Sequence, residues 1–334
     1  MLNKITILGS GNWGLTIALL LARKERRVTV WGRNEKFISE ISRTRANSRY
    51  LPGISLPSEI EFTSDFEKAI SNRDLIILGI PSHALRQISE KIVDTKIDIS
   101  KTYFLDLAKG IENETLKRMS EVLFEVLPEA EKNYAVLAGP NIAKEVALTI
   151  PTTSVVSSDN PKLASEIQKT LSTNYFRVYA NDDVIGVELG GALKNVIALA
   201  AGISDGLGFG ANAKSALMTR GLAEISRLGV ELGAKPETFA GLSGMGDLIT
   251  TCVSPSSRNR TLGEKIGKGK TLTEALEEMT MVAEGVNTTK SAFQLSQMLN
   301  IEMPITEAIH NILFEERSPK EVVAELMLRN LKAE

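Results

Sequence analysis

The sequence is poor in the residues that bind metal ions and form disulfides. Its 334 residues include one cysteine, Cys252, and two histidines, His83 and His310. A single cysteine can neither close an internal disulfide nor anchor a cysteine-rich zinc site, and so few histidines argue against a zinc dehydrogenase. We therefore expect no metal site, a core position for Cys252 and a reducing compartment.

An excess of charge and a long apolar run are missing as well. Lys and Arg number 39 against 41 Asp and Glu, so the net charge is −2, and no long basic block occurs. No run approaches the about 18 apolar residues of a membrane span, and no secretory signal precedes the first apolar segment. These features predict a cytoplasmic protein without a nucleic-acid or membrane partner.

The first 31 residues carry the pattern of a dinucleotide-binding unit. Apolar residues 5–8 lead into the motif Gly-Ser-Gly-Asn-Trp-Gly at residues 9–14, followed by apolar segments at 15–22 and 28–31. This order predicts strand, glycine turn, helix and strand. The glycines permit a tight turn, close approach of a pyrophosphate and close packing of the helix, whose first N–H groups face the phosphates. A glycine-rich surface turn is the alternative interpretation.

The end of the second predicted strand indicates which dinucleotide binds. NAD sites usually place an Asp or Glu there for the ribose 2′-hydroxyl, whereas this chain reads Trp-Gly-Arg-Asn at residues 31–34. The guanidinium of Arg33 can bind a 2′-phosphate. We therefore expect NADP(H) to be preferred and NAD(H) to be possible, unless Arg33 is only a solvated charge beside Glu35.

Strands and helices alternate through the first half of the chain. At 43% hydrophobic and 24% charged residues, the chain has the composition of a globular protein and is long enough for two domains. The alternation predicts an α/β domain with a doubly wound, mostly parallel sheet over residues 1–182, and an all-α domain over 183–334. Further strands are predicted at 74–80, 103–107, 134–138, 152–157 and 176–179, helices at 84–93, 114–127 and from Pro161, which Asn160 caps, and an irregular excursion at 38–57.

Residues 188–201 are the most informative part of the second domain. They predict a helix of small and apolar residues with Lys194 and Asn195 in its middle. An ammonium group buried there has a lowered pKa and can take a proton from an alcohol as hydride leaves. The alternative is a lysine whose long side chain reaches solvent.

Two segments further along supply polar groups. Asp247 and Thr251 are four residues apart and so share a helix face, and the alternative is that Asp247 serves only the helix dipole. Residues 254–260, Ser-Pro-Ser-Ser-Arg-Asn-Arg, combine hydroxyls, an amide and two guanidiniums at a predicted helix start. This combination predicts a phosphate site, with a capped helix start and two surface arginines as the alternative.

Taken together, these motifs resemble NAD(P)-dependent glycerol-3-phosphate dehydrogenase of the bacterial type. The match runs in order over nearly the whole chain, and Gly-Ala-Leu-Lys-Asn and Ser-Arg-Asn-Arg are its most specific parts. The motifs lie at residues 9–14, 81–86, 108–110, 139–146, 190–198, 241–252, 257–260 and 282–286.

The resemblance implies a Rossmann-like domain followed by an all-α domain, a homodimer, and interconversion of sn-glycerol 3-phosphate and dihydroxyacetone phosphate for phospholipid synthesis. It assigns catalysis to Lys194 as proton acceptor, with Lys109 and Asp247. The implied cofactor residues are Gly9, Gly11, Asn12, Trp13, Gly14, Arg33, Lys109, Gly139, Ala143, Arg258, Val282 and Glu284. The implied substrate residues are Lys109, Gly139, Asn195, Asp247, Thr251, Ser257, Arg258 and Asn259.

This chain departs from the family pattern at Asn12 and Asn141, where Ser or Thr is frequent. Both amides keep hydrogen-bonding capacity, so we expect the same reaction. Two other functions stay open: a dehydrogenase of similar architecture acting on a non-phosphorylated hydroxy acid, and a non-catalytic NADP-binding sensor. The first has no need of Arg258 for a phosphate, and the second has no need of Lys109, Lys194 and Asp247 together.

Overall fold

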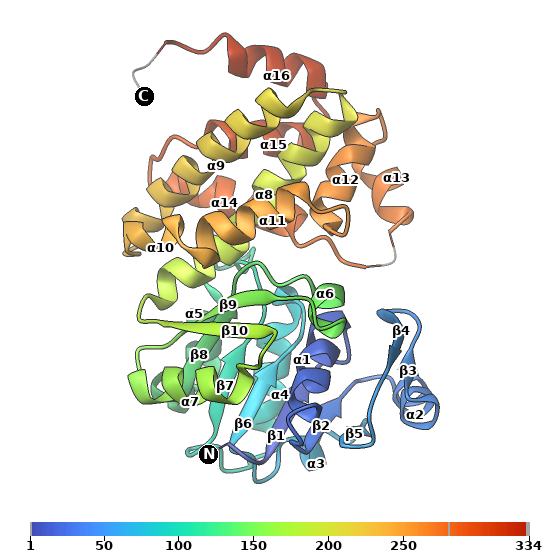
Figure 1. Cartoon of the computed structure of the whole chain (residues 1–334). Helices are drawn as coiled ribbons and strands as arrows, with labels where there is room; N and C mark the ends of the chain where they lie inside the picture. The colour runs from blue at the N-terminus through green and yellow to red at the C-terminus, as the bar shows by residue number, and fades with distance from the viewer. Residues whose placement is uncertain (1, 280, 332–334) are drawn as a thin grey trace. The chain divides into compact units, whose positions relative to one another are not determined.

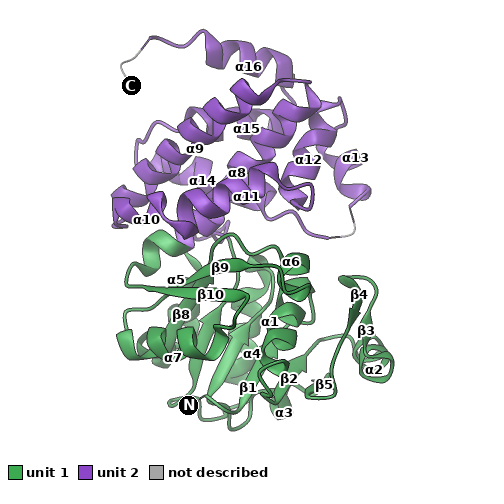
Figure 2. Ribbon diagram, in the orientation of Figure 1, with its two compact units in different colours: residues 1–109, 118–187 green, residues 110–117, 188–334 purple. Residues whose placement is uncertain are grey.

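The protein, seen in a computed structural model that describes residues 2–279 and 281–331, forms two compact units (Figure 2). Unit 1 comprises Met1–Lys109 and Arg118–Val187, and unit 2 comprises Gly110–Lys117 and Glu188–Glu334. The main division follows residue 187 rather than the predicted 182, and it falls inside helix α8 (Val184–Gly206). No local pattern in residues 110–117 indicates that they group with the second unit.

Unit 1 is built around one eight-stranded sheet (Figure 1). Its strands are β1 (Ile5–Leu8), β2 (Val28–Trp31), β5 (Ile60–Thr63), β6 (Leu75–Leu78), β7 (Tyr103–Asp106), β8 (Tyr134–Ala138), β9 (Thr152–Ser157) and β10 (Phe176–Asn181). Their order is β10-β9-β8-β7-β6-β1-β2-β5, and every pair is parallel except β8 with β9. The doubly wound, mostly parallel sheet is confirmed.

The chain reverses its direction of winding between β1 and β6. Strand β1 pairs with β2 on one side and with β6 on the other. Ligands of such sheets bind outside the carboxyl ends of the strands at this point. The helices of this unit are α1 (Asn12–Ala22), α3 (Phe66–Ile70), η1 (Ser82–Ala84), α4 (Leu85–Asp94), α5 (Met119–Val126), η2 (Pro128–Asn133), α6 (Ala143–Ala147) and α7 (Pro161–Leu171).

Two predicted segments differ from the structure. Residues 38–57, expected to be irregular, lie in helix α2 (Glu35–Thr44) and a hairpin of β3 (Ala46–Asn47) and β4 (Leu51–Ser55). Asn34 starts α2 by accepting a hydrogen bond from the Phe37 N–H, a cap that the proline-based argument overlooked. The helix expected at 114–127 begins only at Met119, because Leu116 has a positive φ of 59°.

Among the described residues from 188 onward, the regular elements of unit 2 are all helices, and the first of them is α8. This helix is long and apolar enough to cross a membrane, but 94% of its most apolar window is buried, so it is a core helix. The other helices are α9 (Ala211–Glu231), α10 (Pro236–Ala240), the π-helical turn η3 (Leu242–Gly246), α11 (Asp247–Val253), α12 (Arg258–Gly267), α13 (Leu272–Glu277), α14 (Gly285–Met298), α15 (Pro304–Phe314) and α16 (Pro319–Met327).

Glycines let α12 approach the backbone of α8. A Cβ added at Gly202 of α8 would lie 2.0 Å from the Arg260 carbonyl oxygen. One added at Gly263 of α12 would lie 2.1 Å from the Leu199 carbonyl oxygen. Real Cβ atoms do not make such contacts, so only glycine permits this packing. The first turn of α12 is therefore held at a fixed place relative to Lys194 on α8.

The buried carboxylate of Glu224 connects two helices of unit 2 that are far apart in the sequence. Glu224 on α9 accepts hydrogen bonds from the N–H groups of Ile305 (2.7 Å) and Thr306 (3.1 Å) in the first turn of α15. Burial raises the pKa of Glu224 to about 7, although these hydrogen bonds oppose the shift. Between about pH 4.5 and pH 7 the folded chain thus keeps a proton that the unfolded chain loses, so the free energy of unfolding falls as pH rises.

Replacing this carboxyl group should remove that pH dependence. Between pH 5 and pH 8, we expect the free energy of unfolding of the parent protein to fall by roughly 2–3 kcal/mol more than that of Glu224→Gln. Urea unfolding of both proteins at the two pH values measures the difference. An identical pH dependence in the two proteins would show that Glu224 does not titrate in this range.

Candidate active site

The glycine turn between β1 and α1 has the geometry that the motif predicts. Gly9 has a φ of +120°, and a Cβ there would lie 2.3 Å from the Gly79 carbonyl oxygen at the end of β6. A Cβ on Gly14 would lie 2.6 Å from the Gly9 carbonyl oxygen. Both positions therefore require glycine, and together they bring α1 close to the carboxyl ends of β1 and β6.

Gly11 plays a different part in the turn. A Cβ added there would meet nothing within 4 Å, so the space beside its backbone is open. Gly11 is the N-cap of α1 and has no side chain to cap it, and the first turn carries no acidic residue, although Asn12 Oδ1 accepts from the Trp13 N–H (2.8 Å). The indole N–H of Trp13 is buried and has no hydrogen-bond partner among the described residues. The turn thus fits the pyrophosphate of a dinucleotide.

Two other predicted cofactor residues of unit 1 lie on elements next to this turn. The Thr16 hydroxyl of α1 donates to the Ala143 carbonyl oxygen (3.3 Å), which places the start of α6 against α1. Arg33 follows β2, whose last residue Trp31 accepts a hydrogen bond from the Gly9 N–H (2.9 Å). The Arg33 side chain is exposed and has no ion pair within the described residues. A guanidinium in this position is available to a phosphate group.

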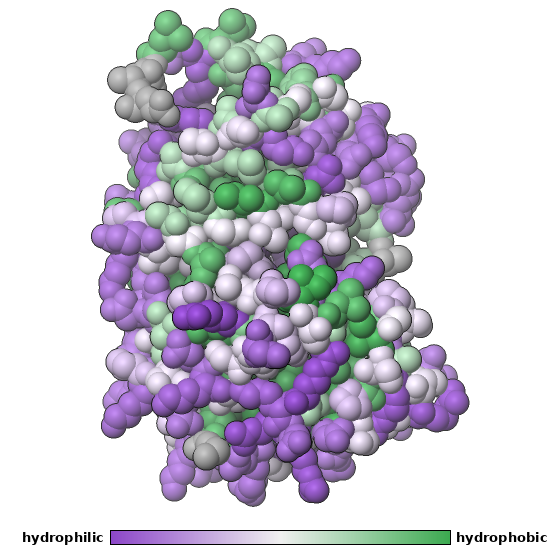
Figure 3. Space-filling view, in the orientation of Figure 1, coloured by the Kyte–Doolittle hydropathy of each residue, from purple (hydrophilic) through white to green (hydrophobic). Residues whose placement is uncertain are grey.

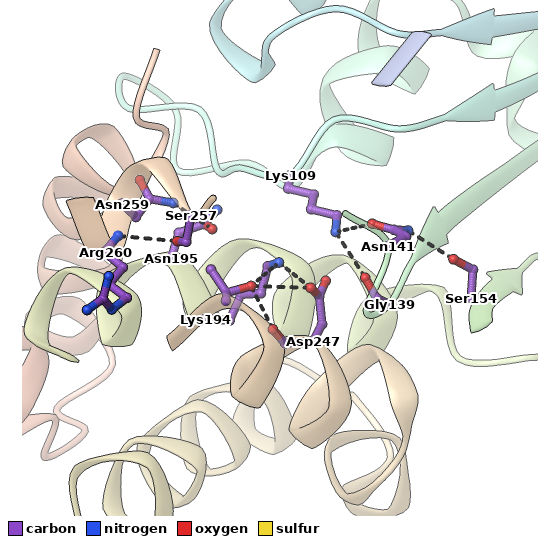
Figure 4. A network of polar contacts seen from close by, with 11 residues as sticks. Lys109, Gly139, Asn141, Ser154, Lys194, Asn195, Asp247, Ser257, Asn259 and Arg260 are labelled. Carbon is purple, nitrogen blue, oxygen red and sulfur yellow. Dashed lines mark hydrogen bonds and ion pairs between the residues drawn. The ribbon is translucent and has the colours of Figure 1, made fainter. Parts of the chain in front are cut away.

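Lys109 lies in a polar cluster after β7 (Figure 4). Its Nζ donates to the Gly139 carbonyl oxygen (3.5 Å) and to Asn141 Oδ1 (3.3 Å). Asn141 Nδ2 in turn donates to Ser154 Oγ (2.9 Å) on β9. The structure thus brings together the predicted residues Lys109 and Gly139. It gives Asn141, a residue of the motif at 139–146, a contact with Lys109, and it adds Ser154, which belongs to none of the motifs.

Lys194 forms the centre of a buried cluster in unit 2. Its Nζ forms an ion pair with Asp247 Oδ1 and donates to Thr251 Oγ1 (2.8 Å). The side chains of Lys194 and Asp247 are only 7% and 3% exposed. The predicted burial of Lys194 is confirmed, and the alternative of a solvent-reaching side chain is wrong. No other charged residue is close to Lys194 in the sequence of its helix, but in the structure Asp247 of α11 contacts it directly.

A second group of predicted residues joins α8, α12 and α14. Asn259 Nδ2 donates to Asn195 Oδ1 (2.8 Å), and both side chains are drawn in Figure 4. Asn259 Oδ1 accepts from the Gly285 N–H (2.9 Å). Ser257 caps α12 by accepting from the Arg260 N–H (3.2 Å). These contacts join the start of α12 to α8 and α14. The N–H groups of a helix start can bind an anion.

The two arginines at the start of α12 have different surroundings. Arg258 is half-buried and donates to the Val282 carbonyl oxygen (2.8 Å). Burial lowers its pKa, and the carboxylate of Glu284 opposes that shift. Arg260 instead forms an ion pair with Asp205 of α8 (2.6 Å). Only Arg258 is therefore placed with the predicted residues Val282 and Glu284, and Arg260 has a structural partner.

Cys252 on α11 is fully buried, which confirms its predicted core position. Burial raises the pKa of its thiol to about 12. The thiolate, which is the reactive form of cysteine, is therefore not populated near neutral pH. Cys252 is excluded as a nucleophile.

Comparison with known proteins gives matches along the chain. Residues 4–164 match the family model described as NAD-dependent glycerol-3-phosphate dehydrogenase N-terminus, and residues 183–324 match the corresponding C-terminus model. Glycerol-3-phosphate dehydrogenase [NAD(P)+] of Thermoanaerobacter sp. is 53% identical over 332 residues, covering 99% of this chain and 98% of that protein.

Solved structures give the same picture. The crystal structure of glycerol-3-phosphate dehydrogenase from Coxiella burnetii has a TM-score of 0.92 at 38% identity, covering 97% of this chain and 98% of that chain. D-mandelate dehydrogenase with NADH has a TM-score of 0.61 at 15% identity, covering 94% of this chain and 98% of that chain. This second likeness shows a shared fold alone.

Proposed function

Since the chain belongs to the NAD-dependent glycerol-3-phosphate dehydrogenase family, we propose that it interconverts sn-glycerol 3-phosphate and dihydroxyacetone phosphate with NADP(H) or NAD(H). The observation that carries the proposal is the buried Lys194–Asp247 pair in a chain that matches the family at both its Rossmann-like and its helical part. A sensor that only binds NADP has no need of this pair. When bound, the dinucleotide supplies or accepts the hydride at C2 of the substrate.

The proposed proton donor and acceptor is Lys194. In the reducing direction its Nζ gives a proton to the C2 oxygen of dihydroxyacetone phosphate, and in the oxidising direction it takes the hydroxyl proton back. Asp247 and Thr251 hold Nζ in one position, which removes the cost of ordering a long side chain during the reaction. Lys109 contributes a second positive charge for the developing alkoxide.

The proposed substrate-binding residues divide by the group that they bind. Arg258 and the start of α12 bind the phosphate, since a guanidinium and free N–H groups form charge-assisted hydrogen bonds with it. Ser257 and Asn259 belong to this helix start and thus to the phosphate end of the substrate. The proposed residues for the hydroxyl and carbonyl oxygens are Lys109, Gly139, Asn195, Asp247 and Thr251. The proposed cofactor residues are Gly9, Gly11, Asn12, Trp13, Gly14, Arg33, Lys109, Gly139, Ala143, Arg258, Val282 and Glu284.

An initial-rate assay tests the proposed reaction. The purified protein is mixed with NADPH and either dihydroxyacetone phosphate or dihydroxyacetone, and absorbance at about 340 nm reports oxidation of the cofactor. We expect rapid oxidation with the phosphorylated substrate alone, because Arg258 binds its phosphate. Turnover of 2-oxo acids in place of dihydroxyacetone phosphate would support the hydroxy-acid dehydrogenase. NADPH binding without turnover of any substrate would support the sensor.

The cofactor preference is tested at Arg33. An Arg33→Asp substitution replaces the proposed 2′-phosphate ligand with a carboxylate that suits a free 2′-hydroxyl. We expect NADPH affinity to fall roughly 30-fold or more, with NADH affinity unchanged or improved. Titration of cofactor fluorescence measures both constants. Lys36→Asp, which changes an exposed cation three residues further along, is the control, and equal losses in the two variants would contradict the role of Arg33.

We also propose that the enzyme works in the cytoplasm, mainly reducing dihydroxyacetone phosphate for glycerophospholipid synthesis, and that it forms a homodimer. The C-terminal end of α16 and the residues after it support a partner for unit 2, because Met327, Leu328 and Leu331 are 80%, 85% and 101% exposed. Figure 3 shows hydrophobic residues in green at the surface of the protein. Light scattering on the purified protein tests the dimer, and a monomer at micromolar concentration would contradict it.

A further inference from the structure

We propose that Arg49, together with Arg33, binds the 2′-phosphate of NADP(H) and so helps to determine which dinucleotide the protein prefers. The inference rests on the proposed binding of the cofactor at the turn after β1, and it adds a residue that belongs to none of the sequence motifs. Arg49 lies in the turn between β3 and β4. Figure 1 shows this hairpin together with α2 beyond β5, the last strand of the sheet.

The turn that carries Arg49 is attached to the glycine motif by one buried side chain. Asn47 is only 2% exposed. Its Nδ2 donates to the Ser10 carbonyl oxygen (3.3 Å), and its Oδ1 accepts from the Tyr50 N–H (2.9 Å). Asn47 thus fixes the turn of residues 48–50 and joins it to residues 9–14.

The turn that carries Arg33 meets the same residue of the motif. A Cβ added at Gly32 would lie 2.8 Å from Ser10 Oγ, so the backbone next to Arg33 approaches Ser10 closely. The ring of Phe37, in the first turn of α2, contacts the ring of Tyr50 edge to face at a centroid distance of 5.9 Å. The two arginine-bearing turns are therefore joined at Ser10 and again through Phe37 and Tyr50.

The guanidinium of Arg49 is ordered in a way that leaves its edge available. Its Cζ lies 5.1 Å from the centroid of the Tyr50 ring. Stacking on a ring uses the face of the guanidinium and leaves the N–H groups at its edge able to bind a phosphate. The side chain is exposed, and no carboxylate of residues 2–279 or 281–331 forms an ion pair with it. Two such guanidiniums suit the charge of a 2′-phosphate.

The two other arginines close to Arg49 in the sequence have different positions. Arg45 donates to the carbonyl oxygens of Pro57 (3.4 Å) and Ile60 (2.7 Å), and its Cζ lies 5.7 Å from the centroid of the Phe62 ring. It therefore has a structural role. Arg43 is exposed in the last turn of α2, outside the turn that Asn47 fixes, and is a matched control.

Calorimetric titration with two fragments of the cofactor tests the proposal. Adenosine 2′,5′-bisphosphate carries the 2′-phosphate, whereas adenosine 5′-monophosphate does not. We expect Arg49→Ala to lower the affinity for the bisphosphate about 10-fold, as loss of a hydrogen bond to a charged group predicts, and to change that for the monophosphate less than about twofold. NADPH and NADH should differ in the same way, and Arg43→Ala should leave all four affinities unchanged. An equal effect of Arg49→Ala on both fragments, or none on either, would overturn the proposal.

Two further variants test the arrangement of the site. Arg33→Ala/Arg49→Ala should bind the bisphosphate no more tightly than the monophosphate, and a retained preference would overturn the proposal. Asn47→Ala should lower the preference for the bisphosphate a few-fold, and in an Arg49→Ala background it should lower it less than about twofold, because the side chain that it positions is gone. An equal loss in both backgrounds would show that Asn47 does not act through Arg49.

Thermal unfolding of each variant identifies any loss of folding. A parent protein that binds both fragments equally well would also overturn the proposal. The titrations need no turnover, so a parent protein that prefers the bisphosphate but does not reduce dihydroxyacetone phosphate would refute the proposed reaction and leave the role of Arg49 supported.

Discussion

Lys194→Ala should lower kcat about 1,000-fold while the affinity for NADPH stays within twofold of the parent value. General acid–base catalysis by one side chain contributes typically 10²–10⁴-fold, and Lys194 is the proposed group that moves the substrate proton. Its Nζ is held by Asp247 and Thr251, so we expect no other lysine to take its position in the variant. Steady-state kinetics with dihydroxyacetone phosphate and a fluorescence titration with NADPH measure the two quantities.

The variant leaves the Asp247 carboxylate buried without its partner, which by itself costs about 3–5 kcal/mol of stability. The double variant Lys194→Ala/Asp247→Asn removes that charge and should recover the melting temperature but not the activity. Lys268→Ala is the matched control, since Lys268 is an exposed lysine of the same unit that pairs with Glu264 (2.6 Å). Unchanged turnover of a folded Lys194→Ala protein would remove Lys194 from the mechanism.

Gly11→Val should give a folded protein that binds neither NADPH nor NADH. A Cβ at Gly11 meets nothing within 4 Å and the φ of −74° suits any residue, so the fold tolerates the change. The added side chain instead fills the space that the pyrophosphate requires next to the N–H groups of α1. We expect affinity for both cofactors to fall about 100-fold or more, which corresponds to the loss of two charge-assisted hydrogen bonds.

Two other glycines serve as controls for this variant. Gly210 is the N-cap of α9 and also has nothing within 4 Å of an added Cβ, so Gly210→Val should bind cofactor normally. Gly14→Ala should instead lower the melting temperature, because its Cβ would lie 2.6 Å from the Gly9 carbonyl oxygen. Normal cofactor affinity in Gly11→Val would contradict the placement of the dinucleotide at this turn.

The sequence predicted those parts of the fold that depend on local patterns. The apolar runs at β1, β2, β6 and β8 and the glycine motif follow from spacing alone, and each occurs as expected. The capping of α7 by Asn160 was equally predictable, because a cap acts within three residues. The prediction missed α2 because most of its residues are polar and exposed, and only Ile38 and Ile41 are buried against the rest of unit 1.

Contacts between distant residues could not be predicted in the same way. Lys194 and Asp247 are 53 positions apart in the sequence, and Glu224 is 81 positions from Ile305, whose N–H it accepts. Neither leaves a local signal, since a buried charge and its partner can lie on any two elements. The ion pair of Arg260 with Asp205 could not be predicted for the same reason, although the sequence suggested Arg260 as a phosphate ligand.

The most direct test of the account is to follow the transferred hydrogen. Dihydroxyacetone phosphate is reduced with NADPH that carries deuterium at C4 of the nicotinamide, and the product is examined by mass spectrometry and NMR. We expect sn-glycerol 3-phosphate with one deuterium at C2 when one of the two C4 epimers is used, and none with the other. Oxidation of the cofactor without deuterium at C2 of the product, or no oxidation at all, would contradict it.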